Sequence, residues 1–453
     1  MNNKPLCVDL DGTLIATDSL WESILLLFRT WQIFLLPFWL IRGRAYLKYK
    51  VAQHVSLNVA TLPYYENVLK FLQDEKQKGR VLVLATAAHE SIAQAVAKHL
   101  NLFDIVIASD LDTNLKGVNK RDALTKRFGV YDYIGDSSAD IPIFEAANKS
   151  YLVGKDFEIP KKSWTIWLKA LRPHQWSKNV LIFLPLLFSH QFTDFSKLVD
   201  VLLAFAAFSL AASAGYVLND LLDLAADRIH KTKKYRPFAA GLIPIPSALV
   251  LFGILIVSSL FISLWWLSLT FTMMVVIYLL LTISYSVYLK RKRVIDIFIL
   301  ASFYTHRILA GGIVIMVPIS SWLLGFSMFI FLSLAFLKRY IELYNLSDRN
   351  KIKHRDYDVC DIEMMSNMGA NSGYLAVLVF ALYINNDKIT SLYTSPEILW
   401  FICPILLYWI TRIWFLANRN RVLDDPVKFV LTDKISWLVI FSIMILVMLA
   451  KLC

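Results

Sequence analysis

The chain has 453 residues, of which 57% are hydrophobic and 18% charged, and a net charge of +12 at pH 7. Its mean hydropathy of +0.53 excludes a secreted disulfide scaffold, a disordered tail or a fibrous repeat. The Lys and Arg residues gather between apolar segments, which favours membrane topology over a nucleic-acid partner. The four cysteines show no disulfide or metal-ligand spacing. The composition predicts an integral membrane protein with a smaller soluble part.

Residues 1–155 alternate short apolar runs with helical stretches. Buried strands that alternate with helices predict an α/β domain with a Rossmann-like parallel sheet. The apolar runs are PLCVDL, GRVLVLATAA, FDIVIASD and the segment that leads into DYIGDSSAD. We therefore expect a soluble α/β domain at the N-terminal end of the chain.

Residues 24–41 are apolar enough to suggest a transmembrane helix, but polar residues and a proline interrupt them. A single crossing there would also place a membrane between Asp9 and Asp136, which the motifs below require to lie together. We therefore expect residues 19–62 to form a helical, membrane-associated cap with Trp and Phe toward lipid. A re-entrant hairpin that dips into the membrane is the alternative.

The remainder of the chain consists of long apolar stretches separated by charged loops. We expect residues 156–174 to be a linker or interfacial helix, and residues 175–453 to form an all-α membrane domain. Most stretches approach the ~20 residues that cross a bilayer, so about nine transmembrane helices are predicted. The first and seventh are short, and we expect them to be tilted or locally broken. The predicted spans are 179–192, 198–218, 246–264, 266–287, 295–316, 320–337, 373–386, 396–416 and 434–451.

Basic residues are distributed unevenly among the loops. Four alternate loops carry 5, 4, 6 and 4 Lys or Arg, whereas the loops between them carry almost none. The basic loops are 228–236, 290–293, 338–355 and 419–434. This bias predicts that the basic loops and the α/β domain lie in the cytoplasm.

A first group of chemically reactive residues lies in the α/β domain. Asp9 and Asp11 occur in VDLDGT, directly after an apolar strand, where Gly12 allows a sharp turn. Carboxylates at the carboxyl end of a parallel strand stand at the ligand-binding edge of the sheet. Four further polar residues follow strands or open helices downstream: Thr86, Lys120, Asp136 and Asp140.

This ordered pattern resembles the haloacid dehalogenase-like phosphatases over residues 1–155. The resemblance implies that Asp9 is the nucleophile that forms an aspartyl phosphate and that Asp11 is the general acid/base. An anionic nucleophile needs Mg²⁺ and a Lys to suppress repulsion by the phosphoryl group. The resemblance also implies that Thr86 and Lys120 hold the phosphoryl oxygens, and that Mg²⁺ is bound by Asp9, Asp11, Asp136 and Asp140.

A second group lies at 219–241, NDLLDLAADRIHKTKKYRPFAAG. Asp220, Asp223 and Asp227 have the spacing of one helix face, and Asn219 precedes them. Three carboxylates at the end of a membrane helix repel one another unless a divalent cation neutralises them. Oxygen ligands of this kind suit Mg²⁺, which commonly bridges to phosphate groups. Since basic residues follow within a few positions, we expect a diphosphate site; positive-inside anchoring is the alternative explanation for those basic residues.

This motif, together with the predicted helices, resembles the UbiA superfamily of intramembrane prenyltransferases over about residues 165–453. It is similar above all to one branch, the bacterial decaprenyl-phosphate phosphoribosyltransferases, which join a polyprenyl phosphate to phosphoribosyl diphosphate. The supporting segments are LRPHQWSKNVL at 171–181, DRIHKTKKYRPFAAG at 227–241, YSVYLKRKRVIDI at 285–297, HRILAGG at 306–312 and KRYIEL at 338–343. The resemblance implies a multi-pass protein of the bacterial inner membrane.

The loop after the sixth span supports that branch. Aromatic prenyltransferases carry a second Asp-rich motif there, whereas this loop begins LKRYIELYNLSDRN. Lys338 and Arg339 are suited to binding an anionic acceptor phosphate and are not suited to binding a second metal ion. Membrane anchoring is the alternative for this pair, and His306 carries no expected catalytic role because a packed histidine is the commoner outcome.

The resulting hypothesis is a Mg²⁺-dependent transfer of 5-phosphoribosyl to a polyprenyl phosphate. The three aspartates hold the metal, Asn219 orients the donor, and Lys178, Lys234 and Arg236 clamp phosphate groups. The lipid phosphate is already ionised, so no strong base is needed. The N-terminal domain would then remove the 5-phosphate, giving a polyprenyl-phosphoryl ribose.

Two other classes of function remain open from the sequence. One is a prenyltransferase that uses a polyprenyl diphosphate and a small aromatic acceptor, with an independent phosphatase domain. The other is a transporter or membrane scaffold with a regulatory domain, although no internal repeat is evident. The lipid's chain length, the final glycan and the oligomeric state are not determined by these patterns.

Overall fold

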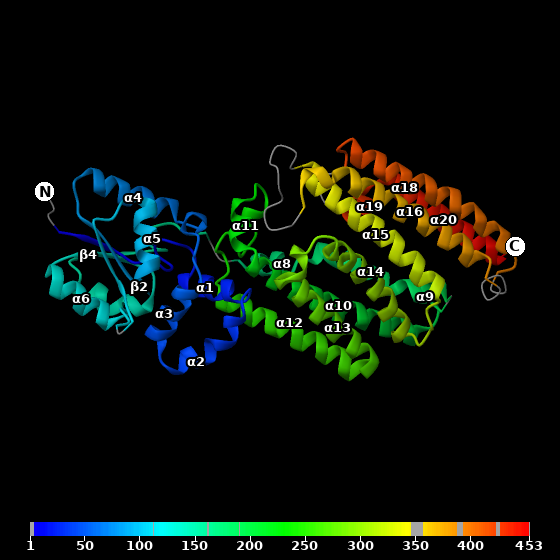
Figure 1. Cartoon of the computed structure of the whole chain (residues 1–453). Helices are drawn as coiled ribbons and strands as arrows, with labels where there is room; N and C mark the ends of the chain where they lie inside the picture. The colour runs from blue at the N-terminus through cyan, green and yellow to red at the C-terminus, as the bar shows by residue number, and fades with distance from the viewer. Residues whose placement is uncertain are drawn as a thin grey trace. The chain divides into compact units, whose positions relative to one another are not determined.

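The computed structural model describes residues 4–111, 113–160, 163–189, 191–345, 357–386, 393–422 and 426–452 (Figure 1). The chain divides into two compact units. The first contains Met1–Pro173 and Ser213–Ile254, and the second contains His174–Ala212 and Leu255–Cys453. The Asp-rich segment therefore belongs to the same compact unit as the α/β domain.

The α/β domain contains a five-stranded parallel sheet with strand order β3-β2-β1-β4-β5. Strand β1 is central, because Cys7 pairs with Val83 of β2 on one side and Tyr133 of β4 on the other. The strands are β1 (Leu6–Val8), β2 (Leu82–His89), β3 (Ile105–Ser109), β4 (Asp132–Gly135) and β5 (Lys149–Leu152). The predicted Rossmann-like sheet is confirmed.

Helices cover both faces of this sheet, because successive strand residues point to opposite sides. Leu6 and Val8 pack with α4 (Glu66–Gln77) and α5 (Glu90–Leu100). Cys7 lies in the other core, which includes residues of α6 (Val118–Phe128) and α7 (Ile141–Ala146). The continuous apolar runs in the sequence follow from burial on both faces.

The cap consists of α1 (Ser19–Leu27), η1 (Trp31–Leu35), α2 (Leu36–Ile41) and α3 (Arg44–His54). These helices surround a small core of their own that includes Leu27, Trp39 and Val51. The segments Ser19–Leu27 and Trp31–Ile41 are bent by 116° relative to each other, so no straight transmembrane helix forms. The helical character of the cap is therefore confirmed, and its membrane association stays a prediction.

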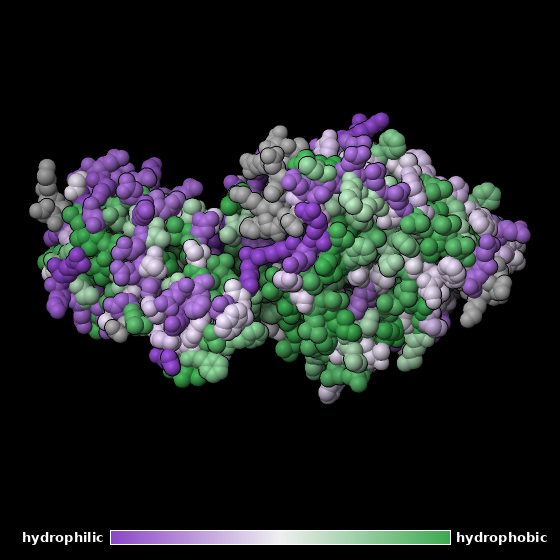
Figure 2. Space-filling model, viewed as in Figure 1, coloured by the Kyte–Doolittle hydropathy of each residue, from purple (hydrophilic) through white to green (hydrophobic). Residues whose placement is uncertain are grey.

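Eight helices in the described residues are long and apolar enough to cross a membrane, or nine if the bent pair in the cap is counted. Lipid-facing side chains are apolar, and Figure 2 shows a broad apolar surface over this helical part. The eight candidate spans are Phe195–Leu222, Ile245–Trp266, Leu269–Val287, Ile295–Val314, Ser321–Tyr344, Val359–Ile384, Pro396–Asn418 and Lys434–Leu452. They contain α10 (Phe195–Leu222), α12 (Ile245–Trp266), α13 (Leu269–Val287), α14 (Ile295–Val314), α15 (Ser321–Tyr344), α16 (Ile362–Ile384), α18 (Ile402–Asn418) and α20 (Lys434–Leu452).

The first predicted span, 179–192, is locally broken as expected, and its described residues 179–189 are not part of a helix long enough to cross a membrane. The segment forms a 3-10 helix, η4 (Pro173–Phe183), followed by the five-residue helix α9 (Leu184–Phe188). Pro185 at the start of α9 lacks the N–H that would extend the preceding helix. The 3-10 segment packs closely on α14, where a Cβ on Gly311 would lie 2.2 Å from the carbonyl oxygen of Ile182.

Candidate active sites

The expected phosphatase residues converge at the carboxyl edge of the sheet. Asp9 directly follows β1, Thr86 lies in β2, and Asp136 directly follows β4. Because β1 lies between β2 and β4, these side chains belong to adjacent strands. Strands β2 and β3 lie on one side of β1, whereas β4 and β5 lie on the other. Ligands of open α/β sheets bind at the carboxyl ends of the strands where the strand order reverses in this way.

Lys120 extends from α6 into this edge and is only 2% exposed. Its Nζ lies 2.9 Å from Oδ2 of Asp9 and 3.6 Å from Oδ1 of Asp140. It also donates to the hydroxyl of Tyr133 over 3.0 Å, and that hydroxyl donates to Oδ1 of Asp140 over 3.1 Å. One buried cation therefore balances part of the charge of two carboxylates.

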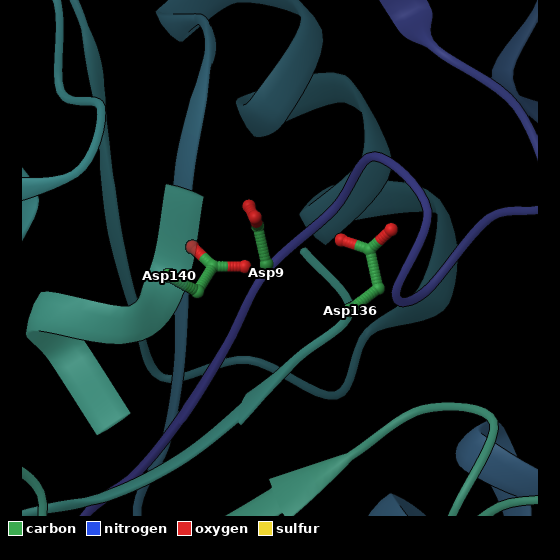
Figure 3. Close-up of side chains that lie close together, drawn as sticks. All are labelled: Asp9, Asp136 and Asp140. Carbon is green, nitrogen blue, oxygen red and sulfur yellow. The ribbon is translucent and has the colours of Figure 1, made fainter. Parts of the chain in front are cut away.

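Asp9, Asp136 and Asp140 form a group that could hold a cation (Figure 3). Each offers one carboxylate oxygen, and these oxygens lie within 4.8 Å of one another. Burial raises the pKa of Asp9, despite the opposing effect of Lys120. Burial, and then the charges of Asp9 and Asp140, raise the pKa of Asp136 to about 6. An oxygen-only set with unbalanced negative charge fits Mg²⁺.

Asp11 was expected at the metal as well, but its carboxylate is directed elsewhere. It accepts hydrogen bonds from the backbone N–H of Ser19 (2.8 Å) and from the hydroxyl of Ser19 (3.1 Å). Among the described residues, the carboxylates close enough to share one cation are Asp9, Asp136 and Asp140, without Asp11. Burial, and then the nearby Asp18, raise the pKa of Asp11 to about 8. A carboxyl that keeps its proton near neutral pH is suited to general acid catalysis.

Two further residues, Gly12 and Thr86, shape this edge of the sheet. Gly12 has φ +75°, a conformation that other residues rarely adopt, and a Cβ there would lie 2.1 Å from a carboxylate oxygen of Asp136. The Thr86 hydroxyl is buried and accepts from the N–H of Ala88 over 3.0 Å. This contact leaves the hydroxyl proton available to a phosphoryl oxygen.

Lys48 was not among the residues expected from the sequence. It lies in α3 of the cap, and its Nζ donates to the carbonyl oxygen of Ala87 (2.5 Å) and to Oδ1 of Asn114 (2.8 Å). Burial lowers its pKa, against the opposing charges of Asp11 and Asp18. Lys48 thus fastens the cap next to Thr86. No sequence pattern distinguishes it from the other basic residues of the cap.

The Asp-rich segment differs from the single helix that its spacing predicted. Helix α10 ends at Leu222 and α11 (Leu224–Ile229) begins after Asp223, which has φ −104° and ψ 12°. The expectation that the three aspartates lie on one continuous helix face is therefore wrong. Asp220 and Asp227 are nevertheless both buried, at 2% and 4% exposed.

Each of the three aspartates pairs with an arginine. Nη2 of Arg172 lies 2.5 Å and 2.6 Å from the two carboxylate oxygens of Asp220. Nη1 of Arg236 joins Asp220 (3.1 Å) to Asp227 (2.6 Å). Asp223 lies 3.4 Å from Nη2 of Arg29.

Among the described residues, Asp220, Asp223 and Asp227 are not grouped closely enough for all three to share one cation in this conformation. The segment nevertheless has the side chains that a site for a cation and a diphosphate requires. It combines buried carboxylates, which suit Mg²⁺, with guanidinium groups, which bind phosphate oxygens well. Arg172 was not expected as a site residue, although it occurs in the LRPHQW segment that supported the family resemblance. Its φ of +53° at the end of α8 (Trp164–Leu171) directs the chain out of the helix there.

The other expected phosphate-binding residues are divided between the two units. Asn219, Lys234 and Arg236 belong to the first unit, in α10, in η5 (Lys233–Tyr235) and directly after η5. Lys234 lies 5.0 Å from the ring centroid of Tyr235. Lys178 in η4 and Lys338 in α15 belong to the second unit.

Arg339 is fully buried in α15, and its guanidinium group pairs with residues of the protein. It pairs with Asp296 (2.5 Å) and Glu342 (2.5 Å) and donates to the hydroxyl of Tyr285 over 3.1 Å. Because all three guanidinium nitrogens have partners, the structure does not support direct phosphate binding by Arg339. Its visible role is to join α14 to α15, since Asp296 lies in α14.

His306 and its neighbour are packed inside the second unit. His306 lies 2.9 Å from the carbonyl oxygen of Met274, as expected for a structural histidine. Arg307 donates to Oδ1 of Asn179 over 2.7 Å and to the hydroxyl of Tyr278 over 3.1 Å. This buried polar group links η4 to α13 and α14, and the sequence carried no signal for it beyond the HRILAGG segment.

Comparisons with known proteins divide the sequence into two consecutive parts. Residues 180–444 match the UbiA prenyltransferase family, and residues 6–145 match the haloacid dehalogenase-like hydrolases. The uncharacterized protein y4nM of Sinorhizobium fredii is 36% identical, over 96% of this chain and 89% of that protein.

Two shorter relatives cover less of the chain. The nodulation protein NoeC of Azorhizobium caulinodans is 31% identical over 61% of this chain and 90% of its own length. The decaprenyl-phosphate phosphoribosyltransferase of Mycolicibacterium smegmatis is also 31% identical, over 61% of this chain and 89% of its own length.

Proposed function

Because the chain belongs to the UbiA prenyltransferase family and carries a haloacid dehalogenase-like hydrolase domain, we propose that it is a bifunctional membrane enzyme. The membrane part transfers 5-phosphoribosyl from phosphoribosyl diphosphate to a polyprenyl phosphate and releases diphosphate. The N-terminal domain then removes the 5-phosphate. The observation that carries the proposal is the pair of buried aspartates joined by Arg236, in a segment similar to enzymes named decaprenyl-phosphate phosphoribosyltransferase.

In the transferase, Asp220, Asp223 and Asp227 would hold Mg²⁺. When bound, this ion supplies positive charge that stabilises the departing diphosphate. Arg172 and Arg236 are placed to bind diphosphate oxygens once a cation shares the aspartates with them.

The bond between the anomeric carbon and the diphosphate breaks, and the diphosphate keeps the electron pair. The developing positive charge on the ribose is met by an ionised oxygen of the lipid phosphate, which forms the new bond on the opposite face. No proton has to be removed from that oxygen, so the transfer does not require a general base. Lys178, Lys234, Lys338 and Asn219 remain proposed phosphate or substrate contacts.

In the phosphatase, the Asp9 carboxylate attacks phosphorus, and the Asp11 carboxyl gives its proton to the leaving ribose oxygen. Lys120 and Thr86 hold the transferred oxygens. Asp136 and Asp140, with Asp9, would hold Mg²⁺, which offsets the repulsion between the anionic nucleophile and the phosphate. This first step releases polyprenyl-phosphoryl ribose. Water then attacks the aspartyl phosphate, with Asp11 accepting its proton, so that inorganic phosphate leaves and the Asp9 carboxylate is restored.

The protein is a multi-pass membrane protein. We propose that it lies in the bacterial inner membrane with the N-terminal domain in the cytoplasm. The reason is that Lys and Arg are concentrated in alternate loops, and loops rich in these residues usually face the cytoplasm. The cap fits a position at the lipid surface. Its η1 and α2 expose large apolar side chains beside basic ones, and Figure 2 shows apolar surface over α2. The apolar residues are Trp31, Phe34, Phe38, Leu40 and Ile41.

The test uses membranes that contain the protein, Mg²⁺ and polyprenyl phosphate. Radiolabelled phosphoribosyl diphosphate should label the lipid, and chelation of the metal should stop labelling. A matched reaction replaces the donor with a polyprenyl diphosphate and an aromatic acid. Product only in the matched reaction would refute phosphoribosyl transfer and establish the prenyltransferase instead.

A further inference from the structure

Helix α1 of the cap connects the two candidate sites within the first unit. At its start, Ser19 donates its backbone N–H and its hydroxyl to Asp11, the general acid of the phosphatase. Just beyond its end, Arg29 pairs with Asp223 of the Asp-rich segment, 3.4 Å away. The segment 19–29, which contains α1, therefore contacts a carboxylate of each site.

Arg29 contacts the Asp-rich segment at the junction between its two helices. Besides Asp223, it donates to the carbonyl oxygen of Leu222, the last residue of α10. Carbonyl groups at the end of a helix lack intrahelical donors and carry partial negative charge, so an arginine is favourable there. Asp223 lies directly before α11. The Arg29 guanidinium therefore contacts both the carbonyl group before this aspartate and its carboxylate.

A second ion pair fixes α1 to the other end of the segment. Nη2 of Arg228, in α11, lies 2.5 Å from Oε1 of Glu22, and both side chains are less than a tenth exposed. The hydroxyl of Thr17 donates to the same carboxylate over 2.8 Å. Arg228 also donates to the carbonyl oxygens of Ala239 (3.0 Å) and Thr61 (3.5 Å).

The backbones also approach closely beyond these ion pairs. Gly241 has φ +69°, and a Cβ on it would lie 2.4 Å from the carbonyl oxygen of Ala16. Ala16 immediately precedes Thr17, which contacts Glu22. The N-terminal domain therefore contacts the Asp-rich segment at Asp223, at Arg228 and at Gly241.

We propose that Arg29 is a positioning residue for the transferase, and that the phosphatase domain thereby forms part of the scaffold of the Asp-rich site. Arg29 holds Asp223 at the break between α10 and α11, and Asp223 would bind Mg²⁺ with Asp220 and Asp227. The inference rests on the proposed function, in which Asp223 is a metal ligand. Both side chains of this pair are about a quarter exposed, so the pair can be broken without burying an unpaired charge.

The experiment uses the full-length protein in lipid nanodiscs. Arg29→Gln removes the charge, Arg29→Lys keeps it, and Arg44→Gln removes an exposed charge elsewhere in the same cap. Hydrogen exchange of residues 219–229 is measured without metal or substrate. The Mg²⁺ concentration for half-maximal phosphoribosyl transfer is measured separately, and hydrolysis of p-nitrophenyl phosphate reports that the N-terminal domain is folded.

Arg29→Gln should speed exchange in residues 219–229 and raise the half-maximal Mg²⁺ concentration about three- to tenfold, the effect of one lost hydrogen bond. Arg29→Lys should restore part of both effects, and Arg44→Gln should show neither. All three variants should hydrolyse p-nitrophenyl phosphate like the wild type. Wild-type exchange and wild-type Mg²⁺ dependence in Arg29→Gln would overturn the inference.

The two hypotheses fail in different ways. If the wild-type protein transfers no phosphoribosyl group, the proposed function is wrong, whereas the exchange measurement still decides whether Arg29 orders the segment. If transfer occurs but Arg29→Gln changes neither readout, the proposed function stands and the positioning role is refuted.

Discussion

Glu22 and Arg228 form a buried ion pair across 206 positions of the chain, with Nη2 of Arg228 2.5 Å from Oε1 of Glu22. The two side chains are 6% and 8% exposed. The pair joins the helical cap of the N-terminal domain to α11, directly beyond the aspartates proposed to bind metal. Its consequence is that the cap and the Asp-rich segment are stabilised together.

Removing one partner of this pair should therefore destabilise the first unit. Glu22→Gln leaves the Arg228 guanidinium buried without its counter-charge, which costs about 3–5 kcal/mol in comparable sites. Thermal unfolding in detergent should show a lower midpoint for Glu22→Gln than for Glu145→Gln, which removes an exposed carboxylate. Equal midpoints for the two variants would mean that the pair contributes nothing to stability.

Asp223→Asn should abolish diphosphate release, because it removes part of the charge and geometry of the proposed metal site. Asp220→Asn should do the same, although Asp220 also balances Arg172 and Arg236 and its loss affects packing. Diphosphate release is measured directly, with p-nitrophenyl phosphate hydrolysis as the folding control. Transfer near the wild-type rate in both variants would refute the metal assignment.

Asp9→Asn should separate the two reactions. Without the nucleophilic carboxylate no aspartyl phosphate forms, so transfer should continue while the phosphorylated lipid accumulates. Thin-layer chromatography of the labelled lipids distinguishes this product from polyprenyl-phosphoryl ribose. If the wild-type protein also stops at the phosphorylated lipid, the N-terminal domain acts on another substrate.

Lys48→Met should weaken the phosphatase without affecting the transferase. The substitution keeps the length of the side chain but loses both hydrogen bonds to Ala87 and Asn114, so the cap is held less firmly beside Thr86. We expect kcat/KM for the lipid phosphomonoester to fall about tenfold, as one or two lost hydrogen bonds predict. Lys50→Met in the same helix is the control, and an equal loss in both variants would contradict a specific role for Lys48.

Cysteine labelling tests the orientation in the membrane. A cysteine introduced at Asp194 should react with a membrane-impermeant reagent from outside intact cells, whereas cysteines at Lys234, Lys290, Lys338 and Arg421 should not. Asp387, predicted to share the outer side with Asp194, lies outside the described residues. Labelling at Lys234 or Lys338 would reverse the proposed orientation.

Local patterns in the sequence were sufficient for the fold class and for the expectation that Asp9 and Asp136 lie together at one edge of the sheet. Strands buried on both faces read as continuous apolar runs, and the residues that follow β1 and β4 must meet because the strands are parallel neighbours. The helices were equally readable, since about 20 apolar residues already specify a spanning length. The first span is broken into short pieces, as expected, because a proline interrupts it and it packs closely on Gly311. The seventh, expected to be short, is instead a full-length helix, Ile362–Ile384.

The ion pairs and the course of the Asp-rich segment were decided by tertiary structure. Arg172 meets Asp220 across 48 positions and Arg29 meets Asp223 across 194, and no local periodicity records such pairs. The Asp-rich spacing predicted one helix face, yet the chain breaks at Asp223. Arg339, basic in sequence and expected to bind phosphate, is instead buried against Asp296. A sequence states which side chains carry charge, but the partner of each charge depends on which distant segments the fold brings within a few ångströms, where the electrostatic interaction becomes strong.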